Sequence, residues 1–556
     1  MIFWGVLPWM GFLVDNVLAI DLIHVALVIL FLLLCRKYLN KNILYSIDKK
    51  DVVYIAIILA IFISSAFYLA MEKKICLNSP FQQGWVPLKI AKIMAKTGKY
   101  YMSEFSLSHL DNESECMFYI FPQRLDAVPF IYFLVVSFIG TNTYINLWAN
   151  FISSMFFIIL VYILMKFVTK KHEIGLMASI AFIASPVYLM GVFYNEIAIS
   201  SFFIVLSIFF ILLSLKINKL HFYILTFLII SFTAKVRPEN SILFAIFFIS
   251  VLIFNRSFLR HRTFWKNISV SLILALLLGI IFITHILFMP KFWGLEFMGP
   301  EYKWKYPFAF ENFSENLKED SLYLVQQNGI VIMIFLVFGI YYGFIKHRKV
   351  LLLFLSSMMP YAIVYLLYAH GSERYTYHLN LFIIPIAGMG IYFAYKLISE
   401  HFHFRNKTVF AAIFSLIVFL LIFLPFAVQK NSCEIGTIEF LGGLDELATR
   451  FKSNDIIVTG RDDFAHIFNY LTDSCVIYVA FTTDGFVIKE YEKADWEKIK
   501  SFIEGNEKIT YYIMPKREAT ENYKYYEGMY RKISSIFDLK PVFENKVASV
   551  YRIITR

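Results

Sequence analysis

Apolar stretches long enough to cross a lipid bilayer recur along the first three quarters of the chain. A helix needs about 20 apolar residues to span the hydrocarbon core, and stretches near that length predict roughly twelve spans. We place them at residues 17–35, 51–71, 143–168, 174–193, 197–215, 220–235, 240–255, 268–288, 329–345, 350–368, 378–397 and 408–428. Hydrophobic residues make up 59% of the 556 residues, more than in soluble domains. The pattern therefore predicts a polytopic α-helical membrane domain over residues 1–428.

Basic residues fall in alternate short connections between these spans. Lysine and arginine concentrate at residues 36–50, 166–171, 216–219, 256–266, 346–349 and 405–407. The positive-inside rule assigns these connections to the cytoplasm of a plasma-membrane protein. The net charge of +11 then reflects membrane topology and not nucleic-acid binding. No basic segment typical of a signal peptide precedes the first span, so we expect that span to be retained. Both ends of the chain are then extracytoplasmic.

The outer segments have patterns of their own. The outer loop 72–142 contains an amphipathic stretch, 88–96, which ends at Gly98 and predicts a helix at the membrane surface. The apolar run 130–139 is too short to span a bilayer and predicts a second interfacial helix. In the tail, short apolar runs at 455–459, 475–480, 510–514 and 547–553 alternate with helical patterns. This alternation predicts a small extracytoplasmic α/β domain over residues 429–556.

Charged residues interrupt the apolar pattern at one extracytoplasmic turn in particular. Lys235, Arg237 and Glu239 lie between two apolar stretches, and Pro238 breaks the helix there. Each such charge costs ~2.5–3.5 kcal/mol on insertion scales, so it usually faces a partner or a water-filled site. Broken backbone at this depth is tolerated mainly where it lines protein or a cavity.

Two further outer turns carry charges. Glu196 precedes one apolar run, and Arg374 with Tyr375 opens another. Any one of these turns is explained as readily by charges resting at the lipid headgroups. Three charged turns on one side of the bundle favour a polar site.

Cysteines are also distributed by side of the membrane. Cys76 and Cys116 share the first outer loop, Cys433 and Cys475 share the outer tail, and Cys35 lies alone at a cytoplasmic span end. Pairs outside and a single thiol inside are typical of disulfide formation in an oxidising compartment. We predict the bonds Cys76–Cys116 and Cys433–Cys475.

Metal-ligand spacing is not evident. His109, His370 and His378 are scattered among isolated acids without the spacing of a binding motif. We assign no metal site and leave a divalent cation open as a cofactor.

The arrangement of these features resembles the GT-C superfamily of integral-membrane glycosyltransferases, in particular its protein-mannosyltransferase and aminoarabinose-transferase-like branch. The resemblance covers most of residues 51–428. Its elements in chain order are Ala91 with Gly98 and Tyr100, Val128-Pro129-Phe130-Ile131-Tyr132, Asn195-Glu196, Arg237-Pro238-Glu239, and Arg374-Tyr375 with Pro385. It implies transfer of a sugar from a polyprenyl-phosphate carrier to a lipid, glycan or protein acceptor on the outer face, among membrane lipids.

One position departs from the family pattern. Members usually carry an acid about fifteen residues before the glycine that ends the first interfacial helix, whereas this chain has Gln83 there. Glutamine does not accept a proton at neutral pH. Either another acid serves as the base, with Glu196, Asp126 and Glu239 as candidates, or catalysis has been lost.

The chemistry suggests a role for each charged residue. A phosphate leaving group needs cations, and the arginine guanidinium matches phosphate through two parallel hydrogen bonds. We therefore assign Lys235, Arg237, Arg374 and Tyr375 to the donor phosphate and Glu196 to the base. Two alternatives stay open, a catalytically silent relative that acts as a scaffold or receptor and a membrane transporter. A transporter is often built from inverted repeats, and no internal repeat is evident here.

Overall fold

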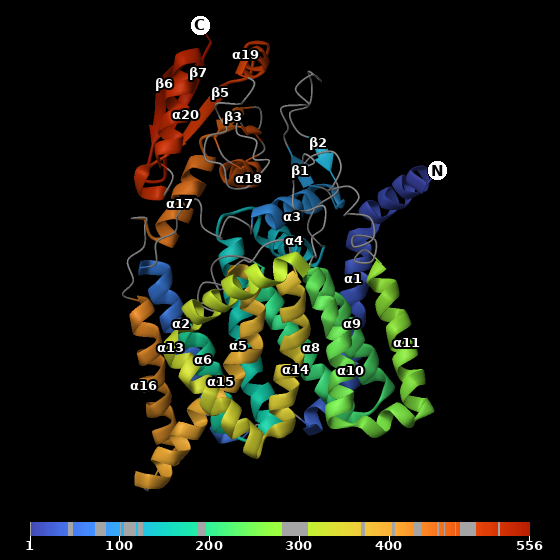
Figure 1. The fold of residues 1–556 in the computed structure, drawn as a ribbon. Helices are drawn as coiled ribbons and strands as arrows, with labels where there is room; N and C mark the ends of the chain where they lie inside the picture. Colours follow the sequence, from blue (N-terminus) through green and yellow to red (C-terminus); the bar gives the residue numbers. More distant parts are fainter. Residues whose placement is uncertain are drawn as a thin grey trace.

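The protein folds into a helical bundle with a smaller α/β domain at one end (Figure 1). The structure, a computed structural model, describes residues 2–42, 48–72, 85–100, 102–104, 118–120, 126–185, 196–280, 310–367, 373–402, 406–427, 435–452, 455–460, 462–472, 474–478, 496–520 and 523–555. We call the end of the bundle beside the α/β domain the domain end. The N-terminal helix also begins on this side (Figure 1).

Twelve helices make up the described bundle. They are α1 (Ile2–Asn42), α2 (Lys49–Glu72), α5 (Ile145–Thr169), α6 (His172–Ala184), α8 (Ile197–Ile217), α9 (Leu220–Val236), α10 (Leu243–Phe254), α11 (Arg262–Leu278), α13 (Phe313–Lys346), α14 (Arg348–Leu367), α15 (Glu373–Phe402) and α16 (Lys407–Ala427). Within the described ranges, eight of them are long and apolar enough to cross a membrane, namely α1, α2, α5, α8, α13, α14, α15 and α16. The predicted polytopic helical fold is confirmed.

Within the described residues, the helices at the remaining predicted spans are shorter than a bilayer requires. α6, α9 and the segment Pro238–Phe254 are apolar helices of 10–17 residues. The prediction near 268–288 falls on α11, which begins earlier, at Arg262. The short helices pack inside the bundle, and α9 is buried along nearly its whole length. Protein contacts therefore cover much of the surface that lipid would otherwise contact.

Close helix packing explains two of the glycines. A methyl group at Gly339 of α13 would overlap the backbone carbonyl of Ile386 in α15, and one at Gly390 would overlap that of Phe335. Small residues let membrane helices approach this closely. The two glycines therefore allow the backbones of α13 and α15 to pack in direct contact.

The C-terminal domain contains a mixed sheet. Its elements are α17 (Thr437–Ala448), β3 (Ile456–Thr459), α18 (Asp462–Leu471), β4 (Cys475–Tyr478), α19 (Trp496–Glu504), β5 (Thr510–Pro515), α20 (Tyr523–Ile536), β6 (Asp538–Glu544) and β7 (Ala548–Ile554). The strand order is β4-β3-β5-β7-β6, with β4, β3 and β5 parallel and the last two antiparallel. The four apolar runs of the sequence form β3, β4, β5 and β7. The edge strand β6 is largely exposed and was missed because its pattern is polar.

Two helices that the sequence predicts to be interfacial, α3 (Trp85–Thr97) and α4 (Ala127–Ile139), lie between the bundle and this domain (Figure 1). A hairpin of β1 (Met102–Glu104) with β2 (Phe118–Ile120) lies beside them. Although α3 is amphipathic in sequence, two of its lysines, Lys89 and Lys92, are buried. The Lys92 ammonium donates hydrogen bonds to the carbonyl oxygens of Tyr470 and Thr472, at 2.8 and 2.6 Å. It thus caps the C-terminal end of α18, where helix carbonyls lack partners.

A second set of contacts joins the domain to the start of α5. The Thr143 hydroxyl donates to Asp445 at 2.6 Å, and the Tyr470 hydroxyl donates to the carbonyl of Asn142 at 3.1 Å. Burial raises the pKa of the Asp445 carboxyl and of the Tyr470 hydroxyl above their usual values. The domain is therefore packed on the bundle through buried polar contacts.

Candidate functional site

The broken hairpin at the end of α9 organises the candidate site. Pro238 lacks an N–H and forces the residue before it out of the helical conformation. Arg237 is accordingly extended, with φ −150° and ψ 137°, and a short 3-10 helix, η4 (Pro238–Ile242), leads into α10. Lys235 still belongs to the last turn of α9. The break therefore sends two basic side chains that are two residues apart in different directions.

Lys235 points into a fully buried cluster with two carboxylates. Its Nζ lies 2.7 Å from Oδ2 of Asp126, the residue that begins α4, and it also forms an ion pair with Asp21 of α1. The exposed fraction of all three side chains is 0%. We assigned Lys235 to the donor phosphate, but its ammonium is already shared between two acids.

The cluster holds two acids and one base, and some of its carboxyl oxygens lack hydrogen-bond partners. Among the described residues, Oδ2 of Asp21 and both oxygens of Asp126 have no hydrogen-bond partner, and Oδ2 of Asp126 is engaged only through its ion pair with Lys235. One helical turn after Asp21, Nε2 of His24 lies 2.9 Å from the carbonyl oxygen of Leu228. Buried polar atoms are usually hydrogen-bonded, so an orphaned carboxylate oxygen calls for a functional explanation. Sequence reasoning missed Asp21, although an acid inside the first apolar run was a visible signal.

Arg237 lies in a second polar group. Its Nε is 2.8 Å from Glu239, and the two side chains are 14% and 11% exposed. The Tyr365 hydroxyl donates to Glu239 at 3.5 Å and lies 2.6 Å from Nδ1 of His378. On the other side of this ring, Nε2 lies 3.0 Å from the Ser200 hydroxyl. A continuous polar network therefore runs from the break through α14 and α15 to α8.

Glu196, the third candidate acid, lies directly before α8 at the same end of the bundle. It is 7% exposed and makes no side-chain cap of that helix. Burial and the Glu196 charge raise the pKa of the Tyr132 hydroxyl in α4, which donates to Asn146 at 2.6 Å. The described ion pairs of the hairpin thus join Asp126 to Lys235 and Glu239 to Arg237.

The other predicted site residues are described only in part. Arg374 and Tyr375 belong to the first turn of α15, and their side chains lie outside the described residues. Gln83 also lies outside them. The structure therefore does not test the roles assigned to these three.

Cysteine chemistry is described at two positions. Cys35 is a buried free thiol, whereas Cys475 is disulfide-bonded. Cys76, Cys116 and Cys433 lie outside the described residues. The partner of Cys475 is therefore one of these three, and the pairing stays a prediction.

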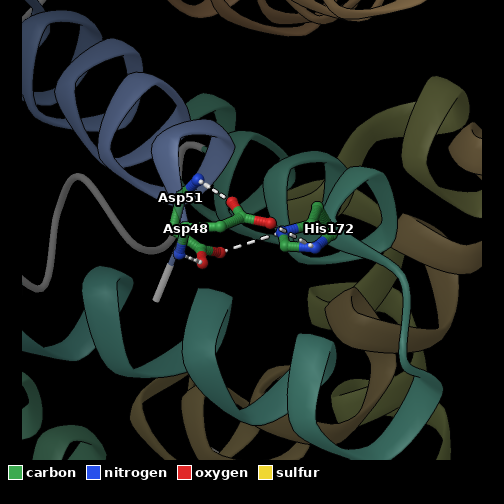
Figure 2. Close-up of side chains that lie close together, drawn as sticks. All are labelled: Asp48, Asp51 and His172. Carbon is green, nitrogen blue, oxygen red and sulfur yellow. Dashed lines mark hydrogen bonds and ion pairs between the residues drawn. The ribbon is translucent and has the colours of Figure 1, made fainter. Parts of the chain in front are cut away.

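Acidic and histidine side chains also gather at the opposite end of the bundle, where α2 and α6 begin (Figure 2). Nδ1 of His172 lies 2.9 Å from Asp51, and Nε2 lies 3.5 Å from Asp48. Asp51 also accepts hydrogen bonds from the Lys166 ammonium at 2.6 Å and the Tyr162 hydroxyl at 2.5 Å. The spacing would suit a metal ion, but an ammonium already neutralises the buried carboxylate. We interpret this group as a clamp between α2, α5 and α6.

Comparison with known proteins identifies the fold. The structure is similar to crystal structures of ArnT from Cupriavidus metallidurans bound to undecaprenyl phosphate (TM-score 0.60, 9% identity) and in the apo state (TM-score 0.59, 10% identity). Each comparison covers 90% of this chain and 97% of the other. The archaeal oligosaccharyltransferase AglB from Archaeoglobus fulgidus aligns with a TM-score of 0.45, 12% identity, and coverage of 89% of this chain and 74% of that one. Neither family models nor curated protein sequences match the chain.

The predicted GT-C resemblance is confirmed at the level of the fold. At about a tenth identity to ArnT, the likeness shows the fold alone. Together with the eight apolar helices, it identifies the chain as an integral membrane protein.

Proposed function

We propose that the protein is a membrane glycosyltransferase that moves a sugar from a polyprenyl-phosphate-linked donor to an acceptor at the domain end of the bundle. The observation that carries the proposal is the broken hairpin, which places a carboxylate–ammonium cluster and an arginine–carboxylate pair within the five residues 235–239 of α9 and η4. The GT-C fold supports it, because the similar structure of ArnT holds undecaprenyl phosphate.

Arg237 is the residue that we assign to the donor phosphate. It keeps some exposure, and its guanidinium offers the planar geometry that binds phosphate oxygens. Arg374 and Tyr375, at the start of α15, remain assigned to the same group. Lys235 is reassigned to the support of the acid, because two carboxylates already surround its ammonium.

Asp126 is the acid that the geometry favours as the base, in place of Glu196. It begins α4, lies at the hairpin through Lys235, and has an orphaned oxygen, Oδ1. In the proposed step, an acceptor hydroxyl attacks the anomeric carbon of the donor sugar. The bond from that carbon to the phosphate oxygen breaks, the polyprenyl phosphate leaves with the electron pair, and the hydroxyl proton passes to the carboxylate.

Binding of the product carrier is the most direct test. The purified protein in lipid nanodiscs is titrated with undecaprenyl phosphate, and the bound carrier is counted by native mass spectrometry. Arg237→Ala should weaken binding by about tenfold or more, since charge-assisted hydrogen bonds contribute roughly 1.5–3 kcal/mol. The matched control is Arg260→Ala, an exposed arginine on the connection after α10. Equal loss in both variants, or none in Arg237→Ala, contradicts the assignment.

Transfer itself is measured by release of undecaprenyl phosphate from a panel of undecaprenyl-phosphate hexoses and pentoses, with lipid and peptide acceptors. Carrier binding without turnover of any donor favours the silent-relative alternative, which Gln83 already suggests. Adding a chelator to the same assay shows whether transfer requires a divalent cation. The extracytoplasmic position of the site is part of the proposal and follows from the basic connections of the sequence.

A further inference from the structure

The first helix brings a charged side chain into the candidate site. Asp21 lies within the apolar span Asp15–Leu39 and forms an ion pair with Lys235, more than 200 residues away along the chain. α1 packs along α9 and also touches α4, the helix that Asp126 begins. Asp21 thus contributes from an element that precedes the sequence motifs of the glycosyltransferase resemblance, which start after residue 51.

Charge neutralisation does not explain Asp21. One ammonium and one carboxylate, Lys235 and Asp126, would already form a neutral buried pair. A second carboxyl group at 0% exposure adds the cost of burying a further acid, whether it is ionised or shares a proton with Asp126. A residue kept at such a position has a use that outweighs its energetic cost.

The geometry of the ammonium suggests that use. A lysine ammonium has three N–H donors that point in different directions. Here Asp21 takes one side of Lys235, and Asp126 is engaged through Oδ2 while Oδ1 has no partner in the described chain. Without Asp21, the ammonium would move onto Asp126 and engage both of its oxygens.

We propose that Asp21 is a positioning residue for Asp126. It shares the Lys235 ammonium, and so it holds Asp126 with one oxygen paired and the other directed to take the proton of the acceptor hydroxyl. This inference rests on the proposed function, and it adds to that function a contribution from α1.

A thermal comparison tests the sharing without any activity measurement. Asp21→Asn and Asp126→Asn each leave a neutral pair, so each variant should unfold within a few degrees of the wild type. The double variant strands a buried ammonium, so its loss should far exceed the sum of the single losses. Adding Lys235→Met to the double variant should recover most of that loss. Additive losses without recovery would overturn the shared ammonium.

A kinetic comparison tests the positioning. With the most active donor of the panel, Asp21→Asn should lower kcat by about 10²-fold, the scale of a misplaced catalytic group, with KM for the donor unchanged. Asp21→Glu should restore part of kcat, which loss of folded protein would not predict. The control is Asp15→Asn, on the same helix as Asp21, which removes an exposed ion pair between Asp15 and Lys99.

The outcomes separate the two proposals. An unchanged kcat in Asp21→Asn overturns the positioning role while transfer by the wild type still stands. If the wild type transfers no sugar from any donor, the proposed function fails, and the positioning role fails with it. The thermal comparison then still shows whether Asp21 and Asp126 share the Lys235 ammonium.

Discussion

Lys92 and Tyr470 are 378 residues apart in sequence and 2.8 Å apart in space, from the lysine Nζ to the tyrosine carbonyl oxygen. The same ammonium also reaches the carbonyls of Asn469 and Thr472. One buried side chain of the interfacial helix α3 thus closes the end of a helix in the C-terminal domain. The C-terminal domain is therefore packed against α3, which lies next to the candidate site, and is not connected to the bundle by the chain alone.

Lys92→Met should loosen the domain. The substitution keeps the aliphatic volume but leaves buried carbonyl oxygens without a donor, at a cost of about 1–3 kcal/mol. Hydrogen exchange in nanodiscs should show faster exchange at the C-terminal end of α18, with the bundle unchanged. Lys96→Met, on the exposed part of the same helix, is the matched control. Equal protection in both variants would mean that Lys92 does not hold the domain.

The base assignment predicts a contrast between two acids. Asp126→Asn should lower kcat by about 10²–10⁴-fold, the range for loss of a general base, with carrier binding retained. Glu196→Gln should have a much smaller effect, because the Lys235 ammonium of the hairpin pairs with Asp126 and Asp21. Transfer assays on both variants, with carrier binding as the folding check, measure the contrast. The reverse result would restore Glu196 as the base and make Asp126 structural.

The topology predicts opposite readouts from two reporter fusions. A fusion at Ser257, in a basic connection, should report the cytoplasm, and one at Asn506, in the α/β domain, should report the outer side. Alkaline phosphatase and green fluorescent protein read the two sides independently. Agreement between the two positions would place the domain end in the cytoplasm or change the span count by an odd number.

The two predicted disulfides should stabilise the outer loop and the outer tail against unfolding. Cys433–Cys475 and Cys76–Cys116 would each close a loop of about 40 residues and contribute roughly 3–4 kcal/mol on the chain-entropy account. Peptide mapping of the non-reduced protein by mass spectrometry should recover both pairs, with Cys35 alkylated only after unfolding. Any link from Cys475 to Cys76 or Cys116 would disprove the pairing.

The sequence by itself determined the class of the protein and the place of the break. Span positions depend on local composition, because every backbone group in lipid must be satisfied within its own helix. Pro238 acts on its immediate neighbour, so the break after α9 was predictable from three adjacent residues. The alternating apolar runs likewise predicted β3, β4, β5 and β7, because inward-facing strand residues are apolar wherever the sheet is packed.

Only the tertiary structure decided which charges meet. Lys235 and Arg237 are near neighbours in sequence and were assigned one role, yet the turn between them directs one to Asp21 and Asp126 and the other to Glu239. The amphipathic pattern of α3 predicted a helix at the membrane surface, but α18 covers Lys92. An ion pair or a helix cap depends on the position of its partner in space, and residues hundreds of positions away supply that partner here. The local sequence pattern determines where a charged residue lies on its own helix. The packing of the helices determines which oppositely charged residue lies next to it.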